Sequence, residues 1–295
     1  MESAISSKLA IFVTSLLHFK RSGLHAAFTA ALAIAVCTSA AGQTAQKLPD
    51  APQPQAAGGS QTESTSADAS DAVTLRNTPL HLLRDQGGIW TSPFRISGDD
   101  MKFLVPLVVD TGAAMATDTR AMTQVVPINA SLNQHSTDAS NMLIGGFIAT
   151  PVALYGLGHF KENPHATEAG ILTGEAMIDS VAVEQGMKLM FWRERPSQDS
   201  AKGHFFESSA GIDSSFPSSH CVVAWSAAAV LAGEYHSRWS QLFIYSAAAS
   251  VSATRVLGQQ HFPSDVLVGS AAGWLVGHYV YRHRHKFIVR SDDDY

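Results

Sequence analysis

The sequence predicts an all-α fold, a single bundle of about six core helices. Apolar or amphipathic windows longer than a typical strand follow one another, and Ala, Leu, Met and Gly recur in them at helical spacing. None of these windows shows the two-residue alternation of a half-buried strand. Prolines stand where two of them begin, as is common in the first turn of a helix. The six windows are residues 100–118, 140–160, 166–192, 218–236, 238–257 and 264–283.

Residues 1–41 are typical of a secretory signal peptide. Basic residues up to Arg21 precede an apolar stretch, AAFTAALAIAVCTSAAG, whose small residues indicate cleavage near Ala40 or Ala41. We therefore expect an exported protein. Residues 42–80 are rich in Ala, Gln, Ser, Pro and Gly and have no apolar period, so they predict a disordered linker.

The rest of the chain divides into a helical domain, residues 81–285, and a polar C-terminal tail, residues 286–295. The stretch IWTSPFRISGDD predicts an ordered lead-in segment to this domain. Cys221 is the only cysteine left once the signal peptide is removed, so no internal disulfide is expected. A formal net charge of -5 makes the chain a poor candidate for nucleic-acid binding, so no nucleic-acid partner is expected.

Charges within two of the windows favour a protein outside the lipid phase. Window 166–192 contains four carboxylates and window 100–118 contains Asp110 and Asp118, and such groups cost free energy in lipid. We expect an exported bundle, periplasmic or attached to a membrane surface outside the cytoplasm. An integral membrane protein is the alternative, because windows 142–158, 241–257 and 266–281 are apolar enough for it.

The stretch RVLGQQHFPSD, residues 255–265, places three polar groups around one proline. Pro263 marks a helix start and puts Asp265 in the first turn, with His261 just before the helix. A carboxylate on one ring nitrogen fixes the tautomer of a histidine and leaves the other nitrogen free as base or nucleophile. Arg255 can bring a fixed positive charge to the same point.

A second stretch, FPSSHCVVAW, also places polar residues beside a proline at a helix start. Pro217 opens a helix, so the backbone N–H groups of Ser218, Ser219 and His220 are expected as unpaired donors at its positive end. Such an end is suited to a phosphate. Ser218 adds a hydroxyl, and His220 can supply a proton.

A third stretch, KLMFWRERP, supplies two cations. Lys188 and Arg195 are seven residues apart, which is nearly two full turns of an α-helix, so they share a face. Pro196 discourages a helical conformation at Arg195 and thereby predicts that this arginine lies at a helix end. There its guanidinium can hold oxygens in a bidentate manner.

Together these stretches resemble the three signature motifs of the type 2 phosphatidic acid phosphatase superfamily, which includes bacterial class A acid phosphatases and vanadium haloperoxidases. The motifs appear here as K-x6-RP from Lys188, PSSH from Pro217, and TR-x5-H-x3-D from Thr254. The resemblance implies the helical bundle of that superfamily. Two positions depart from the usual pattern: Ser219 replaces a glycine, and Thr254 replaces a serine.

The resemblance also implies roles. The phosphate-binding residues would be Lys188, Arg195, Ser218, Ser219 and Arg255. His261 would attack phosphorus, oriented by Asp265, while His220 would protonate the leaving alkoxide and later activate water. No metal or other cofactor is implied, and vanadate is expected to bind as a phosphate mimic.

The expected function is hydrolysis of phosphate monoesters, of lipids or of small molecules, through a phosphohistidine intermediate. The alternatives are a vanadate-dependent haloperoxidase and a lipid pyrophosphate phosphatase embedded in the membrane. A catalytically inactive phosphate- or lipid-binding module is a further alternative, against which the full set of acid, base and nucleophile argues. The sequence does not set the oligomeric state.

Three further features remain. Cys221 is expected to be a packing residue, since neighbours on a helix point about 100° apart and it therefore cannot share the direction of His220. The basic run YRHRHK, residues 281–286, could offer metal ligands but is expected to complement the negative end of the last helix. HFFE, residues 204–207, lies in a loop where a substrate lid would sit.

Overall fold

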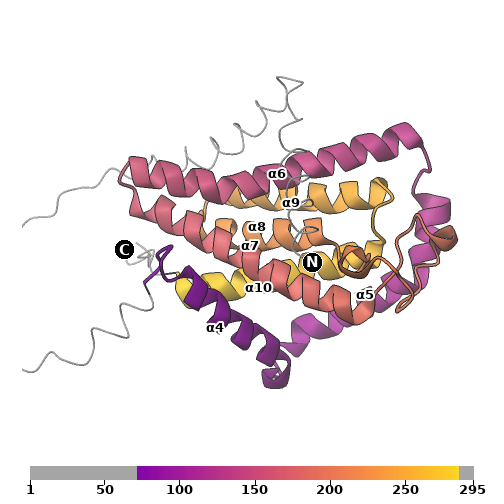
Figure 1. Cartoon of the computed structure of the whole chain (residues 1–295), viewed down its shortest axis with the longest axis horizontal. Coiled ribbons are helices and arrows are strands. Elements are labelled where there is room, and N and C mark those ends of the chain that lie inside the picture. The colour runs from indigo at the N-terminus through magenta and orange to yellow at the C-terminus, as the bar shows by residue number, and fades with distance from the viewer. Residues whose placement is uncertain (1–71, 286–295) are drawn as a thin grey trace, which may run out of the picture.

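A computed structural model describes residues 72–285, and every regular element in this range is helical (Figure 1). The predicted all-α class is confirmed. The predicted signal peptide, residues 1–41, the polar tail, residues 286–295, and most of the predicted linker lie outside the described residues.

All six predicted windows are helices. The described helices are α4 (Thr78–Thr91), α5 (Met101–Arg120), α6 (Ala130–Phe160), α7 (Pro164–Phe191), α8 (Ser219–Glu234), α9 (Arg238–Leu257) and α10 (Pro263–Arg284). Short helical turns are η1 (Ser92–Arg95), η2 (Ala121–Val125), η3 (Asp199–Ala201) and η4 (Gly211–Asp213). The helix α4 was not predicted, and α6 begins ten residues earlier than its window at residue 140.

Buried polar contacts hold α4 on the bundle. His81 is 0% exposed, with its Nδ1 3.1 Å from Glu175 Oε1 on α7. Asp85 is 2% exposed and accepts a hydrogen bond of 2.7 Å from Arg284 Nη2 on α10. The residues that α4 buries are polar, so its sequence has no apolar stripe from which a helix could be predicted.

The polar first part of α6 begins at a side-chain cap. The backbone N–H of Leu132 donates to Asn129 Oδ1 at 3.0 Å, which satisfies one donor of the first turn. The polar first part of the helix contacts the end of α9: Asn133 Nδ2 donates to the carbonyl of Leu257, the last residue of α9, at 2.6 Å. The helix is therefore longer than its apolar window because one end packs on polar groups.

The helix α8 lies in the middle of the bundle (Figure 1). It packs against α6, α7, α9 and α10, and small side chains make this possible. Its buried alanines are Ala224, Ala227, Ala228, Ala229 and Ala232. With so little side-chain volume, the neighbouring helices approach α8 closely and fix the position of its first turn.

Three glycines of α10 make the closest helix contact. Gly269, Gly273 and Gly277 recur every four residues and face the backbone of α8. A Cβ atom at Gly273 would lie 2.2 Å from the carbonyl oxygen of Val222, and one at Gly277 would lie 2.3 Å from a backbone oxygen of the same helix. Only glycine permits this approach.

The bundle brings four helix ends together. The C-terminal ends of α7 and α9 meet the N-terminal ends of α8 and α10, and the C-terminal end of α5 lies beside them. The three sequence motifs lie at these ends. The fold therefore gathers residues that are up to 77 positions apart, from Lys188 to Asp265, at one end of the bundle.

Apolar side chains face outward over much of the bundle. The most exposed on α5, α6 and α9 are Val108, Val109, Val152, Phe160, Trp239 and Leu242, each at least 58% exposed. Within the described residues, α6 is the helix that is long and apolar enough to cross a membrane by length and composition. Exposed apolar surface of this extent marks an interaction surface.

Candidate active site

His261 lies in the loop between α9 and α10 and is 1% exposed. Its Nδ1 is 2.8 Å from the carbonyl oxygen of Ser215. A carbonyl oxygen only accepts, so Nδ1 carries the ring proton and Nε2 keeps a lone pair. Burial lowers the pKa of His261 to about 4; Arg255 adds to this lowering and Asp265 opposes it. The ring is therefore neutral at pH 7, as a nucleophile must be.

The contact expected between Asp265 and His261 is longer than a hydrogen bond. Asp265 Oδ2 lies 3.7 Å from His261 Nδ1, because that oxygen accepts from Ser215 Oγ at 2.5 Å and from the backbone N–H of Phe262 at 2.9 Å. Asp265 thus orients the histidine through Ser215, whose carbonyl binds the ring. The sequence motif did not include Ser215.

Arg193 is a second residue that the sequence analysis missed. It is 2% exposed, and its guanidinium donates to Asp265 Oδ1 at 2.6 Å and to Asp118 Oδ2 of α5 at 2.7 Å. The rings of Phe205 and Phe262 lie over its Cζ at 4.7 and 4.1 Å. Arg193 lies inside the K-x6-RP motif at a variable position, so spacing alone gave no signal for it.

Two arginines supply positive charge to the site. Arg255, on the last turn of α9, donates from Nη1 to Ser140 Oγ of α6 at 3.2 Å. Burial lowers its pKa to about 10, and the charge of Arg195 acts in the same direction. Arg195 follows α7 and donates from Nη1 to the carbonyl of Gln260 at 3.2 Å, next to His261. The two guanidiniums therefore repel each other and favour an anion between them.

Lys188 is held in a buried network on α7. Its Nζ lies 2.9 Å from Glu184 Oε1 and donates to Ser219 Oγ at 2.9 Å. Ser219 Oγ in turn donates to Glu184 Oε1 at 2.7 Å. The serine that replaces the usual glycine therefore adds a hydroxyl that joins the lysine to the start of α8. An ammonium has three donors, so one remains for a ligand.

The start of α8 differs in one detail from the expectation. The backbone N–H of Ser218 is not an unpaired donor, because it donates to the carbonyl of Asp265 at 3.1 Å. Ser219 and His220 are the first two residues of the helix, whose amides have no intrahelical partner. The hydroxyl of Ser218 is buried and makes no hydrogen bond to any residue in the described range.

His220 lies on the first turn of α8. Its Nε2 is 3.0 Å from Asn141 Oδ1 of α6, another residue that the sequence analysis missed. Burial lowers the pKa of His220 to about 3, and the charges of Arg255, Arg195 and Lys188 lower it further. The three cations therefore lie close enough to His220 to act on its charge. Their convergence was the central expectation from the sequence.

The remaining candidates lie apart from this chemistry. Thr254 Oγ1 donates to the carbonyl of Ser250 at 2.7 Å in its own helix, so its hydroxyl does not reach toward the site. Cys221 is 0% exposed and burial raises the pKa of its thiol, as expected for a packing residue. In HFFE, Phe205 packs against Arg193, while the neighbouring Phe206 is 70% exposed.

Comparisons with known proteins agree with this geometry. The family model described as the PAP2 superfamily matches residues 169–288, which include all three motifs. A lipid A 1-phosphatase of Porphyromonas gingivalis is 38% identical over 65 residues, which are 21% of this chain. The match spans only 15% of that relative's length.

A solved structure shows a looser likeness. It is a transmembrane PAP2 type phosphatidylglycerolphosphate phosphatase from Bacillus subtilis, matched with 16% sequence identity and a TM-score of 0.42. The match covers 72% of this chain and 96% of that one. The motif residues gathered at one end of the bundle lie in the part of the chain, residues 169–288, that is similar to the PAP2 superfamily.

Proposed function

We propose that this chain is a phosphatase that hydrolyses phosphate monoesters, with lipid phosphates as its substrate class. One observation supports the catalytic part above all. Arg255 lies close enough to the neutral His261 to act on its charge, and its buried Nε makes no hydrogen bond within the described part of the chain. A buried donor without an acceptor costs free energy, and the oxygens of a phosphoryl group would remove that cost.

The proposed reaction has two steps. In the first, His261 Nε2 attacks phosphorus, a P–N bond forms, and the P–O bond to the leaving group breaks as His220 donates a proton to the alkoxide. In the second, His220 takes a proton from water, which attacks phosphorus and breaks the P–N bond. Inorganic phosphate is released, and both histidines return to their initial states.

Fixed cations would stabilise the charge on the phosphoryl oxygens in both steps. Lys188, Arg195 and Arg255 lie close enough to influence His220, and the amides at the start of α8 add donors. Charge-assisted hydrogen bonds contribute about 1.5 to 3 kcal/mol each. This set of donors lets us propose a reaction without a metal cofactor, in which vanadate competes as a phosphate mimic.

The lipid part of the proposal has separate support. A groove of about 730 Å³ is lined by apolar groups of α5, α9 and α10, and it reaches Val256 and Pro263 beside the catalytic loop. An acyl chain fits a surface of this chemistry. The outward apolar faces of α5, α6 and α9 support association with a membrane, which would bring lipid phosphates to the site.

The catalytic proposal is tested with purified protein, p-nitrophenyl phosphate and a dispersed lipid phosphate. His261→Ala should abolish turnover of both, and labelled substrate quenched in alkali should leave label on the wild type only, since phosphohistidine is acid-labile. His236→Ala, at an exposed histidine between α8 and α9 at the other end of the bundle, is the matched control and should retain activity. Turnover by the His261 variant would contradict the proposal.

Two further measurements distinguish the alternatives. Halide oxidation by peroxide with added vanadate, in the absence of phosphatase activity, would instead identify a haloperoxidase. For the membrane proposal, cell membranes are washed with high salt and then extracted with detergent. We expect release by detergent only, because the exposed side chains are apolar; release by salt would contradict attachment through these faces.

A further inference from the structure

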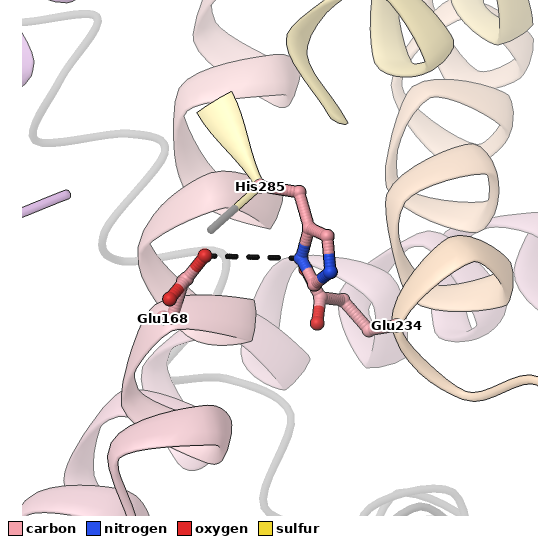
Figure 2. Close-up of side chains that lie close together, drawn as sticks. All are labelled: Glu168, Glu234 and His285. Carbon is pink, nitrogen blue, oxygen red and sulfur yellow. Dashed lines mark hydrogen bonds and ion pairs between the residues drawn. The ribbon is translucent and has the colours of Figure 1, made fainter. Parts of the chain in front are cut away.

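A group of potential metal ligands lies at the end of the bundle opposite the catalytic residues. Glu168 of α7, Glu234 at the end of α8 and His285 just after α10 have ligand atoms that all lie within 4.8 Å of one another (Figure 2). Both glutamates are buried, at 7% and 4% exposure. Glu234 ends the same 16-residue helix that His220 begins, so the group is about 20 Å from the catalytic site.

The spacing of the donor atoms fits a small divalent cation. His285 Nδ1 lies 3.0 Å from Glu234 Oε1 and 3.7 Å from Glu168 Oε1. In a tetrahedral zinc site with bonds of about 2.0 to 2.2 Å, ligand atoms are roughly 3.3 Å apart. Two carboxylates and one imidazole are also a ligand set that zinc accepts.

A further histidine holds Glu234 in position. The side chain of Glu234 is fully buried, and its Oε2 forms an ion pair of 2.9 Å with His165 Nε2. The other oxygen, Oε1, lies 3.0 Å from His285 Nδ1. In a metal site, His165 would remain as an outer partner that orients the glutamate and leaves Oε1 for the cation.

We propose that Glu168, Glu234 and His285 bind a zinc-type divalent cation that joins the ends of α7, α8 and α10. The three protein ligands leave one position for water. Side-chain exposures of 9% for Glu168 and 15% for His285 leave a path for the ion. Glu168 also lines an open hollow of about 680 Å³. The role of such an ion is structural, since it lies far from the phosphoryl site.

The test uses the full chain in detergent, freed of metal with a chelator and then titrated with Zn²⁺. At a hundredfold excess over the dissociation constant, Zn²⁺ should raise the melting temperature by roughly 5 to 10 °C. Mg²⁺ should have little effect, because it prefers an all-oxygen octahedral site. Calorimetry should show one tight Zn²⁺ site per chain, and phosphatase turnover should not need it.

Variants locate the site. His285→Ala should weaken Zn²⁺ binding at least tenfold and remove the thermal shift, as should Glu168→Gln. His283→Ala is the matched control, since this exposed histidine bonds only the Tyr279 carbonyl of its own helix. His285 is partly exposed, so its removal should leave the helix content unchanged by circular dichroism.

Two results would overturn the proposal. The first is a wild-type protein whose melting temperature and heat signal do not respond to Zn²⁺. The second is a Zn²⁺ response that persists in His285→Ala, which would place the ion elsewhere. Glu168, Glu234 and His285 form only an ion-pair cluster if His285→Ala lowers the melting temperature while neither Zn²⁺ nor chelator changes that of the wild type. Neither outcome depends on whether the phosphatase proposal holds.

Discussion

At the scale of single residues, His220 has the most demanding role. Its pKa of about 3 makes it neutral at pH 7, whereas the proposed first step needs it protonated. The shift comes first from burial, then from Arg255 and His261, and then from Arg195 and Lys188; a phosphate anion would partly neutralise the charges of the arginines and the lysine. Binding of the anion should therefore raise the pKa of His220 and draw a proton into the site.

This argument predicts that catalysis is favoured by mild acid. As pH falls from 8 towards 5, more of His220 is protonated, while His261 stays neutral because its pKa is about 4. The value of kcat/KM should therefore rise over this range, and phosphate binding should take up a proton, measured by calorimetry in two buffers of different ionisation enthalpy. An optimum above pH 8 would contradict these roles.

Asn141 offers a second prediction at this scale. Its Oδ1 accepts from His220 Nε2, so it fixes the ring of the proposed acid without touching the reacting atoms. Asn141→Ala should lower kcat about tenfold or more for an alkyl phosphate and less for p-nitrophenyl phosphate, whose leaving group needs little protonation. KM should change little.

The control for Asn141 is Gln134→Ala on the same helix, since Gln134 bonds only Asp138 of its own exposed face. Equal losses on both substrates would show that Asn141 supports the structure and not the acid. So would a loss that appears in KM alone.

The sequence predicted those site residues that lie in the motifs, because helix-start prolines and fixed spacing reveal them. It did not predict Asn141, Arg193 or Ser215. Asn141 belongs to α6, which contacts the motifs only through tertiary packing, and Arg193 and Ser215 stand at positions where the spacing sets no residue type. The sequence also did not predict that Nδ1 of His261 carries the proton, because this follows from the position of the Ser215 carbonyl in a loop.

At the scale of elements, the contact of α8 with α10 sets the geometry of the site. The first turns of these two helices hold the proposed acid, His220, and the proposed orienting carboxylate, Asp265. Their separation is fixed by the glycines that let the two backbones touch. A change in this separation would move the two catalytic groups relative to each other, and a small displacement in a catalytic site is costly.

Gly273→Ala tests this contact. The new Cβ would lie 2.2 Å from the Val222 carbonyl, which cannot move without moving α8, so the melting temperature and kcat should both fall. Gly145→Ala on α6 is the matched control, because no atom lies within 4 Å of its added Cβ. There alanine should stabilise the helix by up to about 1 kcal/mol. Equal behaviour of the two variants would refute the close-contact argument.

Periodicity predicted the six long helices because each has an apolar side to bury. It failed for α4 and for the first part of α6, where polar groups are the buried ones. The sequence of α4 contains His81 and Asp85, which are satisfied by Glu175 and Arg284. A pattern that counts apolar residues assigns such a segment to the surface.

At the scale of the whole molecule, buried ion pairs join distant parts of the chain. Arg193 links α5 to α10 at the catalytic end, through Asp118 and Asp265. Arg284 and Asp85 link α10 to α4, with side chains only 9% and 3% exposed. Breaking one partner of such a pair leaves an uncompensated buried charge, which costs more than the intact pair contributes.

The pair of Asp85 and Arg284 therefore predicts strong coupling between two variants. Asp85→Asn should destabilise the protein by about 3 to 5 kcal/mol, because the guanidinium of Arg284 stays buried without its carboxylate. Replacing both, with Asp85→Leu and Arg284→Met, should recover much of that loss, since apolar groups of similar size need no counter-charge. Thermal unfolding of Asp85→Leu, of Arg284→Met and of the double variant measures the coupling.

Asp99→Asn is the control for this cycle, because its ion pair with Lys102 is more than 80% exposed on both sides and should contribute less than about 1 kcal/mol. If Asp85→Asn behaved like Asp99→Asn, α4 would be held by other contacts. The double variant could also prove no more stable than Asp85→Asn. In that case the loss in Asp85→Asn would come from the missing attraction between Asp85 and Arg284, and not from a buried charge without a partner. The predicted order is Asp85→Asn least stable, the double variant intermediate and Asp99→Asn near wild type.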